Sequence, residues 1–470
     1  MTQATAGEIR PRFPSGDILA SGYLALLALA THASGFGPLG VAFFPLALLL
    51  AGFSPAAFLW ITFAGFLLFF EAHLGASNAG PVNTPDLAAM AFFLHSLLSR
   101  NGFSYRLPLS PLLLFLYAFL AYSFALTVPT IQTHGPFDPW LLRDLKCLLY
   151  LALAALLCRH PGLGPKQLIL LLLGTVLLTA GHAAFCLVQF ALGGGRIFTW
   201  NEIFLADAVP LAVVLLAIPG LRRYRGALRV ALVFSAIGLV LTQTRGVWLG
   251  TAAALIVYGV LQMAGADRAR LRAMGRGLLV GFAILVVASL ASRAAFNIDP
   301  VARIRDRFLQ AGTPTEFIDP YASLGYRIHE SLVVWEQRTW LGHGTGARLH
   351  LFFTQMGKSG MMDWWSIHSE YFEVLHKYGF VGLGLFLLLL GAMAVSAFRL
   401  AWSRQAVPSA MGYSVLLAVT NHAVASITSG YIIREHTAIY FAFLVVVLDR
   451  FGAARCAART ATTDGPAVPE

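Results

Sequence analysis

Apolar runs separated by short polar connectors recur along this chain of 470 residues. Runs of about 16 to 22 residues are long enough for a helix to cross roughly 30 Å of hydrocarbon. They are continuous, whereas the strands of an outer-membrane barrel alternate apolar and polar residues, so we expect helices. The predicted spans are 18–34, 38–52, 56–70, 87–98, 111–128, 141–158, 168–190, 204–219, 230–244, 247–263, 277–292, 379–398, 411–427 and 437–448.

Several of these runs are short, so the pattern predicts about 12 to 14 spans in an all-α polytopic integral membrane protein. Composition agrees, because 58% of the residues are hydrophobic and only 12% are charged, more apolar than a soluble domain can be. The net charge of +11 does not indicate a nucleic-acid partner, because the basic residues lie in alternate connectors. By the positive-inside rule these connectors and both termini are cytoplasmic, and the number of spans is even.

The pattern divides the chain into five segments. They are a cytoplasmic N-terminal segment (1–16), a helix bundle (17–293), a large periplasmic loop (294–378), C-terminal spans (379–450) and a cytoplasmic, disordered tail (451–470). The polar start predicts that no signal peptide is cleaved. The cysteines lie in spans or in the tail without metal-ligand spacing, so we interpret them as packing residues; they are Cys147, Cys158, Cys186 and Cys456.

The loop contains a segment with helical periodicity, SLGYRIHESLVVWEQRTW, at 323–340. Its apolar residues recur at helical spacing and its polar residues share another face, which predicts an amphipathic helix at the membrane surface. The apolar set is Leu324, Ile328, Leu332 and Trp335, and the polar set is Arg327, Ser331 and Arg338. A purely structural interfacial helix would have the same pattern.

Some arginines lie on the extracytoplasmic side, where the positive-inside rule predicts few cations. Arg245 lies between two apolar runs at an extracytoplasmic turn, where it is costly unless it is paired, hydrated or bound to a ligand. Arg143, Arg327 and Arg434 belong to the same set, although Arg143 beside Asp144, and Arg434 beside the next residue, could form ion pairs, and Arg245 could contact lipid headgroups. Several guanidinium groups on one side of the membrane favour an anion with many oxygens, such as a lipid-linked diphosphate.

His368 lies where the loop returns to the membrane, in WWSIHSEYFEVLHKYGFVGLG at 364–384. A neutral imidazole can accept a proton near physiological pH, so His368 is a candidate general base, with a structural hydrogen-bonding role as the alternative. Glu370 and Glu373 are close enough in sequence to orient it. An anion transporter would also use cations, but we would expect its ionisable residues deep within several spans, whereas here they gather at one rim.

Four motifs together resemble the superfamily of O-antigen ligases and Wzy polymerases. They are TQTRGVWLG at 242–250, YRIHESLVVW at 326–335, WLGHGTG at 340–346 and IHSEYFEVLHKYGFVGL at 367–383. Ser369 stands where Asn is commoner after the histidine, and TWNEIF at 199–204 stands where many relatives have Asn-Pro-Asn. The motifs cover roughly 239–385, and the rest of the chain agrees in its pattern of spans.

The resemblance implies a GT-C-like glycosyltransferase of the bacterial inner membrane with its active site facing the periplasm. It would transfer a glycan from undecaprenyl diphosphate to a hydroxyl of lipid A-core, with inversion at the anomeric carbon. Arg245 and Arg327 would bind the diphosphate, and His368 would activate the acceptor. We also assign substrate binding to Arg143, Arg434, Trp335, Gly344, Gly346, Ser369 and Tyr371. We expect a monomer among membrane lipids, without a cofactor.

The sequence favours a mechanism without metal, because the connector after the first run, HASGFGP at 32–38, contains no carboxylate. His343 and His350 have no Cys or His partners at zinc-site spacing. The glycines of LGHGTG predict a tight turn whose backbone approaches sugar or phosphate. Ligation to lipid A-core is the first prediction. A Wzy-type O-antigen or exopolysaccharide polymerase, a protein O-oligosaccharyltransferase, and a flippase or anion transporter are the alternatives.

Overall fold

The computed structural model of the chain describes residues 58–59, 89, 92–93, 110–160, 163–193, 202–242, 244–264, 305, 323–353, 360–364 and 367–463. Five predicted spans lie wholly or largely outside these residues, namely 18–34, 38–52, 56–70, 87–98 and 277–292. The predicted total of spans and the segment boundaries therefore stay predictions.

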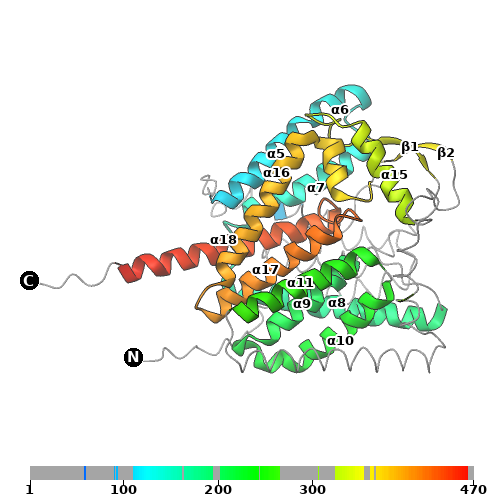
Figure 1. Cartoon of the computed structure of the whole chain (residues 1–470). Helices are drawn as coiled ribbons and strands as arrows, with labels where there is room; N and C mark the ends of the chain where they lie inside the picture. The colour runs from blue at the N-terminus through cyan, green and yellow to red at the C-terminus, as the bar shows by residue number, and fades with distance from the viewer. Residues whose placement is uncertain are drawn as a thin grey trace, which may run out of the picture.

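Helices dominate the described chain (Figure 1). The bundle contains α5 (Pro111–Ala125), α6 (Thr127–His134), α7 (Pro139–Leu157), α8 (Pro165–Gly193), α9 (Glu202–Leu216), the 3₁₀ turn η1 (Pro219–Tyr224), α10 (Arg225–Thr242), α11 (Arg245–Ala264), α16 (Glu370–Ala401), α17 (Ala406–Ala425) and α18 (Glu435–Thr463). Each predicted span from 111–128 to 247–263, and from 379–398 to 437–448, falls on one or two of these helices.

Five stretches of helix in the described chain are long and apolar enough to cross a membrane. They are Pro111–His134, Pro165–Val188, Pro219–Thr242, Arg245–Ala264 and Glu370–Ala401. A polytopic helical membrane protein is therefore supported, and this part of the prediction is confirmed.

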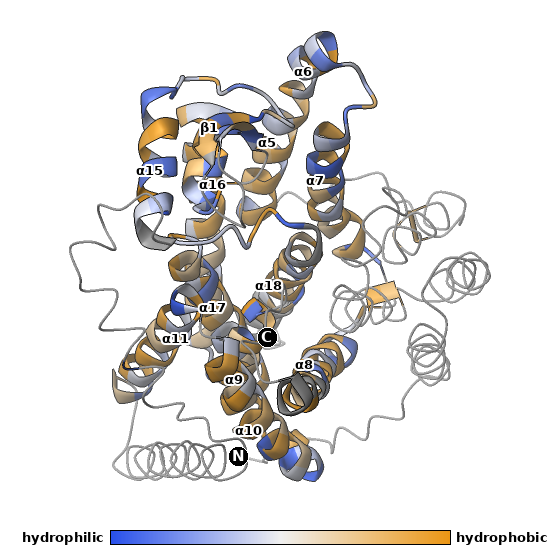
Figure 2. Ribbon diagram, turned by 90° about the vertical axis from the view of Figure 1, so that its right-hand side faces the viewer, coloured by the Kyte–Doolittle hydropathy of each residue, from blue (hydrophilic) through white to orange (hydrophobic). Residues whose placement is uncertain are grey.

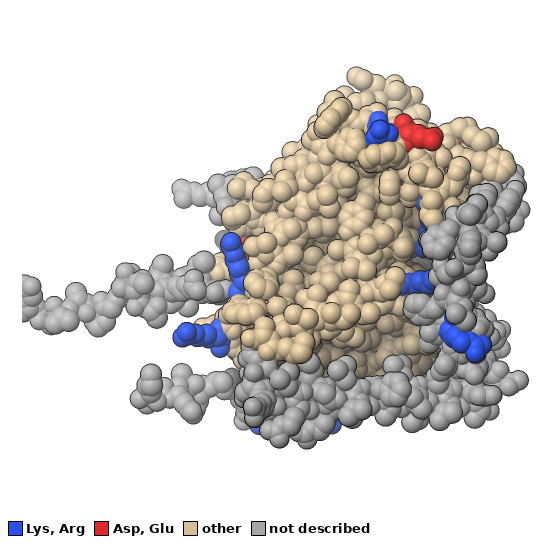
Figure 3. All heavy atoms as spheres, viewed as in Figure 1, with Lys and Arg blue, Asp and Glu red and all other residues tan. Residues whose placement is uncertain are grey.

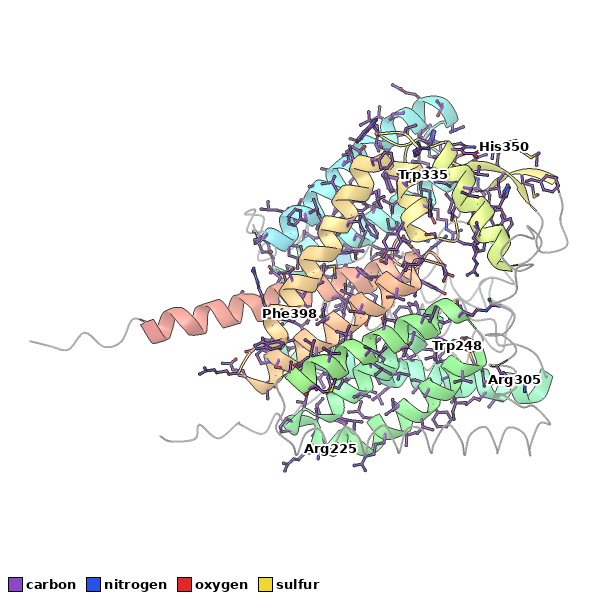
Figure 4. The ribbon with its side chains drawn as sticks, viewed as in Figure 1. Arg225, Trp248, Arg305, Trp335, His350 and Phe398 are labelled. Atoms are coloured by element: carbon purple, nitrogen blue, oxygen red, sulfur yellow. The ribbon has the colours of Figure 1, made fainter. Side chains whose placement is uncertain are left out.

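The bundle has two chemically different ends. Helices α9, α11, α16 and α18 begin at one end of the bundle, and α10 and α17 end there. We call this end the site end. The opposite end, which we call the basic end, includes Arg225, and in Figure 4 this residue lies on the other side of the bundle from Trp248 and His350. In the view of Figure 3, a broad surface without charge separates charged residues at the two ends. This distribution suits a bundle that spans a membrane.

Local sequence fixes several helix ends. Pro139 begins α7, and the Asp138 carboxylate caps this helix by accepting the N–H groups of Trp140 and Leu141 at 2.9 and 3.0 Å. The long helix α16 is interrupted at Gly379, whose φ of +65° and ψ of −168° are not helical. The predicted start of the span at this glycine therefore coincides with a kink, and the helix itself begins nine residues earlier.

Apolar side chains from α5, from α7 to α11 and from α16 to α18 form one core. The ribbons of these helices are largely orange, the colour of hydrophobic residues, in Figure 2. Helix α16 packs on α17 and α5, and α17 packs in turn on α11 and α9. These contacts bring helices from both halves of the sequence together beneath the site end.

The described part of the loop holds one helix and one hairpin. Helix α15 (Ser323–Glu336) confirms that this segment is helical, and Ile328, Leu332 and Trp335 are exposed on it. Its position at a membrane surface stays a prediction. Strands β1 (Leu349–Phe353) and β2 (Gly360–Trp364) pair antiparallel, with Leu349 opposite Trp364. The hairpin was not predicted, so the expectation of helices alone is wrong at this point. A small core of Tyr326, Val334, Leu349, Leu351, Ile367 and Leu375 joins α15, the hairpin and the start of α16.

Candidate functional site

Arg245 begins α11 at the site end, and its place depends on close packing between α11 and α17. A Cβ atom on Gly246 would lie 2.2 Å from Oγ1 of Thr428, and one on Gly250 would lie 2.6 Å from the carbonyl oxygen of Asn421. Glycines at this four-residue spacing let two membrane helices approach closely. The glycines of TRGVWLG therefore hold the arginine at a fixed position on the rim.

A carboxylate at the start of α9 connects the residue before α11 to the segment before α18. Glu202 accepts a hydrogen bond from the Thr244 hydroxyl through Oε2 at 2.5 Å, and one from the Tyr431 hydroxyl through Oε1 at 2.5 Å. Burial and the neighbouring Glu202 carboxylate raise the pKa of Tyr431 well above its usual value, so the phenol stays protonated and donates.

Arg327 on α15 belongs to the same cluster. Burial lowers the pKa of its guanidinium, while Tyr431, Glu202 and Glu330 act in the opposite direction and the nearby Arg245 lowers it further. The electrostatic interaction between Arg245 and Arg327 shows that two arginines 82 positions apart lie near each other. Two neighbouring guanidinium groups suit a ligand with several anionic oxygens.

His368 lies just before α16 and contacts the polar side of α15. Its backbone N–H donates to Oε2 of Glu330 at 2.7 Å, and its Nδ1 lies 3.2 Å from the same oxygen. The ring of Tyr326 packs edge-on against the imidazole with 5.6 Å between centroids. The His368 side chain keeps 29% exposure whereas that of Glu330 has none, so the histidine connects a buried carboxylate to the outside.

Because Glu330 is one helical turn from Arg327, the base candidate and the arginine pair are parts of one cluster. We call Glu202, Arg245, Arg327, Glu330, His368 and Tyr431 the rim cluster. Its members come from α9, α11, α15 and the segments before α16 and α18. The three residues predicted to be catalytic are thus brought together.

Arg434 lies in a second, buried network. Its Nη2 donates to Glu373 at 3.1 Å, and Lys377 donates to Glu373 at 2.7 Å and to Asp144 at 2.9 Å. Burial lowers the pKa of Arg434, but Glu373 and Glu370 outweigh that effect and raise it overall. Arg143 interacts electrostatically with Glu373. We call Asp144, Glu373, Lys377 and Arg434 the buried network.

The two carboxylates expected to orient His368 have other partners. Glu373 belongs to the buried network, and Glu370 accepts the backbone N–H groups of Ile432 and Ile433 at 2.9 and 2.8 Å. The carboxylate at His368 is Glu330, 38 positions earlier. The expectation of Glu370 or Glu373 is therefore wrong, because both point from α16 toward the segment before α18. Asp144 pairs with Lys377 at 2.9 Å, and the ion pair considered for Arg143 and Asp144 stays a prediction.

The predicted glycine turn is confirmed as a tight turn, with φ of +84°, +103° and +84° at Gly342, Gly344 and Gly346. The turn packs against the bundle. The Gly346 N–H donates to Asp144 at 2.8 Å, and a Cβ atom on Gly344 would lie 2.5 Å from Thr130 Oγ1. These contacts explain the glycines by packing, and the expected contact of Gly344 and Gly346 with substrate stays a prediction.

The remaining predicted binding residues lie at the start of α16 and near the end of α15. Ser369 is the residue before α16 and its hydroxyl donates to the Ser426 carbonyl at 3.4 Å. The Tyr371 hydroxyl donates to the Ala423 carbonyl at 2.7 Å. Trp335 is exposed, and the Arg338 guanidinium lies 4.4 Å from its ring centroid. Ser369 and Tyr371 therefore join α16 to α17, and their roles in binding stay predictions.

One ionisable pair lies deeper. His422 Nε2 on α17 is 2.8 Å from Asp207 Oδ2 on α9, and both side chains are buried. Each lies about one turn from the site end of its helix. This pair lies below the rim but near the same end, so the expectation that charged residues gather at one rim stays a prediction.

Among the described residues, no group of three or more His, Cys, Asp and Glu side chains could hold a metal ion. His350 pairs with Asp363 across the hairpin at 2.8 Å, and His343 Nε2 lies 2.8 Å from the Gln337 carbonyl oxygen. The mechanism without metal stays a prediction.

Sequence reasoning missed Glu202, Glu330 and Tyr431. Glu202 lies in TWNEIF, the segment that departs from the usual pattern of relatives. Glu330 follows Arg327 by three residues, so its place on the same helical turn was a usable signal. Tyr431 gives no sequence signal, because a tyrosine at a helix end is common at membrane interfaces.

The fold and the rim cluster define a polytopic helical membrane protein with a polar, arginine-bearing site at one end of its bundle. Residues 230–387 match the sequence model of the Wzy_C family, described as O-antigen ligase, so the chain carries the O-antigen ligase domain of this family, which spans WaaL ligases and Wzy polymerases. The resemblance seen in the motifs is thereby confirmed. The family performs membrane glycan transfer of the ligase or polymerase type, which implies lipid-linked glycan substrates. A search of curated proteins gave no match to this chain.

Proposed function

We propose that this protein is an O-antigen ligase, which transfers O-antigen polysaccharide from undecaprenyl diphosphate to a hydroxyl of lipid A-core without a metal ion. The observation that carries the proposal is the rim cluster, in which Arg245, Arg327 and the base candidate His368 are neighbours although they are far apart in sequence. We also propose the bacterial inner membrane as its location, with the site end toward the periplasm.

The two guanidinium groups would bind the diphosphate of the donor. Negative charge develops on the leaving diphosphate as the bond from the anomeric carbon to oxygen breaks, and fixed cations stabilise that charge. His368 would take the proton of the acceptor hydroxyl as its oxygen forms the new bond to the anomeric carbon. The bonding electrons leave with the diphosphate, and attack from the opposite side inverts the anomeric centre.

Exposed aromatic residues at the end of α15 and just after it favour a large glycan acceptor. Trp335 and Trp340 are exposed at 46% and 74%, and aromatic faces stack on sugar rings. A Wzy-type polymerase or a protein O-oligosaccharyltransferase would use the same donor and base. A flippase or anion transporter would need the arginines but not the base.

The deciding experiment is incubation of the purified protein with undecaprenyl-diphosphate-linked glycan and rough lipopolysaccharide, in chelator. We expect capped lipopolysaccharide on a gel. Longer lipid-linked chains would identify a polymerase, and activity that requires added divalent metal would contradict the mechanism without metal. If no glycan is released from the donor and the intact donor moves across the membrane of proteoliposomes, the protein is a flippase.

Substitutions test the assigned roles. We expect Arg245→Ala and His368→Ala to insert into the membrane normally and to reduce transfer by at least about 100-fold, the usual scale for removing a charge-stabilising group and for removing a general base, respectively. Arg404→Ala and His134→Ala are matched controls, because both residues are exposed and lie away from the rim cluster. Near-normal transfer by His368→Ala would withdraw its role as base, and the same result for Arg245→Ala would withdraw diphosphate binding.

A further inference from the structure

Helix α15 buries a face that its hydropathy does not predict. Tyr326, Glu330 and Val334 recur every four residues and have no exposed surface, whereas Ile328 and Leu332 are 36% and 55% exposed. A carboxylate in the middle of a buried stripe is costly unless it has fixed partners. Glu330 therefore requires an explanation beyond packing.

Glu330 contacts both the backbone N–H and the imidazole ring of His368. Its Oε2 accepts the backbone N–H of His368 at 2.7 Å and lies 3.2 Å from Nδ1, and its Oε1 lies 3.4 Å from Nδ1. The carboxylate can only accept, so Nδ1 carries the proton in this contact. In the neutral ring Nε2 then has the free lone pair.

We propose that Glu330 is a positioning residue for His368, which fixes the tautomer with Nδ1 protonated and stabilises the imidazolium that forms during glycan transfer. This inference rests on the proposed role of His368 as the base. The proton of the acceptor hydroxyl moves to Nε2 as the acceptor oxygen bonds to the anomeric carbon, and the diphosphate leaves with the electron pair of the broken bond. The Nδ1 proton remains on the ring, so Glu330 is not protonated.

The surroundings of the pair fit this role. The edge-on ring of Tyr326 limits rotation of the imidazole, and burial together with Glu330 raises the pKa of the Tyr326 phenol, so this residue brings no second negative charge. Arg327, one turn away, interacts favourably with the Glu330 carboxylate. Tyr326 and Arg327 on α15 interact electrostatically with Glu330, and Nη2 of Arg434 lies 3.4 Å from the carbonyl oxygen of Ile367, the residue before His368.

The test compares Glu330→Gln with Glu330→Ala in the transfer reaction. Glutamine retains an oxygen for the His368 backbone N–H but removes the negative charge, whereas alanine removes both. We expect Glu330→Gln to lower kcat by about 10- to 100-fold, a part of the general-base contribution, with the KM for the donor nearly unchanged. Glu330→Ala should lose more. Glu336→Gln, an exposed carboxylate on the same helix, is the matched control.

The dependence of kcat on pH separates positioning from a structural role. Without the carboxylate the imidazolium is less stable, so the acid limb of the profile should move to lower pH in Glu330→Gln. A structural defect would lower the whole profile without moving it, and that result would overturn the proposal, as would full activity of Glu330→Gln. Full activity of His368→Ala would instead contradict the proposed role of His368 as the base, and absence of any transfer by the unmodified protein would contradict the proposed function, so these failures are distinguishable from failure of the inference.

Discussion

At the scale of single residues, the glycine turn shows how a motif can serve the site through packing. Gly346 has a φ of +84°, and a Cβ atom there would lie 2.7 Å from Cα and from N of Leu141 on α7. The turn also places Thr345, whose hydroxyl donates to the Ser123 carbonyl of α5 at 2.8 Å. The glycines therefore hold the loop that carries α15 and the hairpin against the bundle.

We expect Gly346→Ala to destabilise the protein by about 2 to 4 kcal/mol, because it combines a left-handed backbone with a clash against backbone atoms that cannot move. The thermal midpoint of the purified protein in detergent, followed by fluorescence, measures the effect. Gly391→Ala is the control, because no atom lies within 4 Å of the position of its Cβ and its φ is not positive. Equal midpoints for the two variants would contradict a packing role for the turn.

The sequence identified candidate site residues where the chemistry of a side chain conflicts with its expected location. Arg245 is a cation on the side of the membrane that should lack cations, and His368 stands at a span boundary, so both were found. Glu330 was not found, because an acidic residue on an amphipathic helix is normally solvated, and only the tertiary structure shows that this face is buried.

At the scale of elements, the buried network is the joint between the loop and the membrane helices. It connects α7 through Asp144, the first part of α16 through Glu373 and Lys377, and the segment before α18 through Arg434. Next to it, the kink at Gly379 lets Gly342 approach, since a Cβ atom on Gly379 would lie 2.4 Å from the Gly342 nitrogen. The first part of α16 is thereby held beneath His368.

We expect Asp144→Ala to cost about 3 to 5 kcal/mol, the usual penalty for removing one partner of a buried ion pair and leaving the other charged. Lys377 would lose one of its two carboxylates, and the Gly346 N–H would lose its acceptor. Unfolding in a denaturing detergent, followed by circular dichroism, gives the change. Asp363→Asn removes an exposed pair with His350 and should cost less than about 1 kcal/mol. A loss for Asp144→Ala as small as that of the control would show that the network does not stabilise the joint.

Elements were predictable to different degrees. The spans and α15 follow from hydrophobic periodicity, which is a local property of the sequence. The hairpin was missed because its strands are short, and their pairing depends on a small core shared with α15 and α16. The start of α16 was placed too late, because its first residues carry charges that the structure buries in the network.

At the scale of the whole molecule, the decisive property is that distant segments meet at one end of the bundle. The packing of α11 on α17 and of α16 on α17 and α5 places the rim cluster. Sequence motifs identified the family, but the meeting of Arg245, Arg327 and His368 depends on these helix contacts. The proposed function further requires that the site end face the periplasm, where a lipid-linked donor and lipid A-core can meet.

That orientation leads to the last prediction. In a protein whose native cysteines are all changed to serine, two single-cysteine variants are made. One is Glu336→Cys, at an exposed residue of α15, and the other is Ser403→Cys, just after α16 at the basic end. In intact spheroplasts we expect a membrane-impermeant maleimide to label Glu336→Cys, because the positive-inside rule places the basic end in the cytoplasm. Ser403→Cys should be labelled only after lysis, and it is the control for leakage. If Ser403→Cys is labelled in intact cells and Glu336→Cys is not, the rim cluster faces the cytoplasm, and transfer to a periplasmic acceptor is then impossible whatever the chemistry of the cluster.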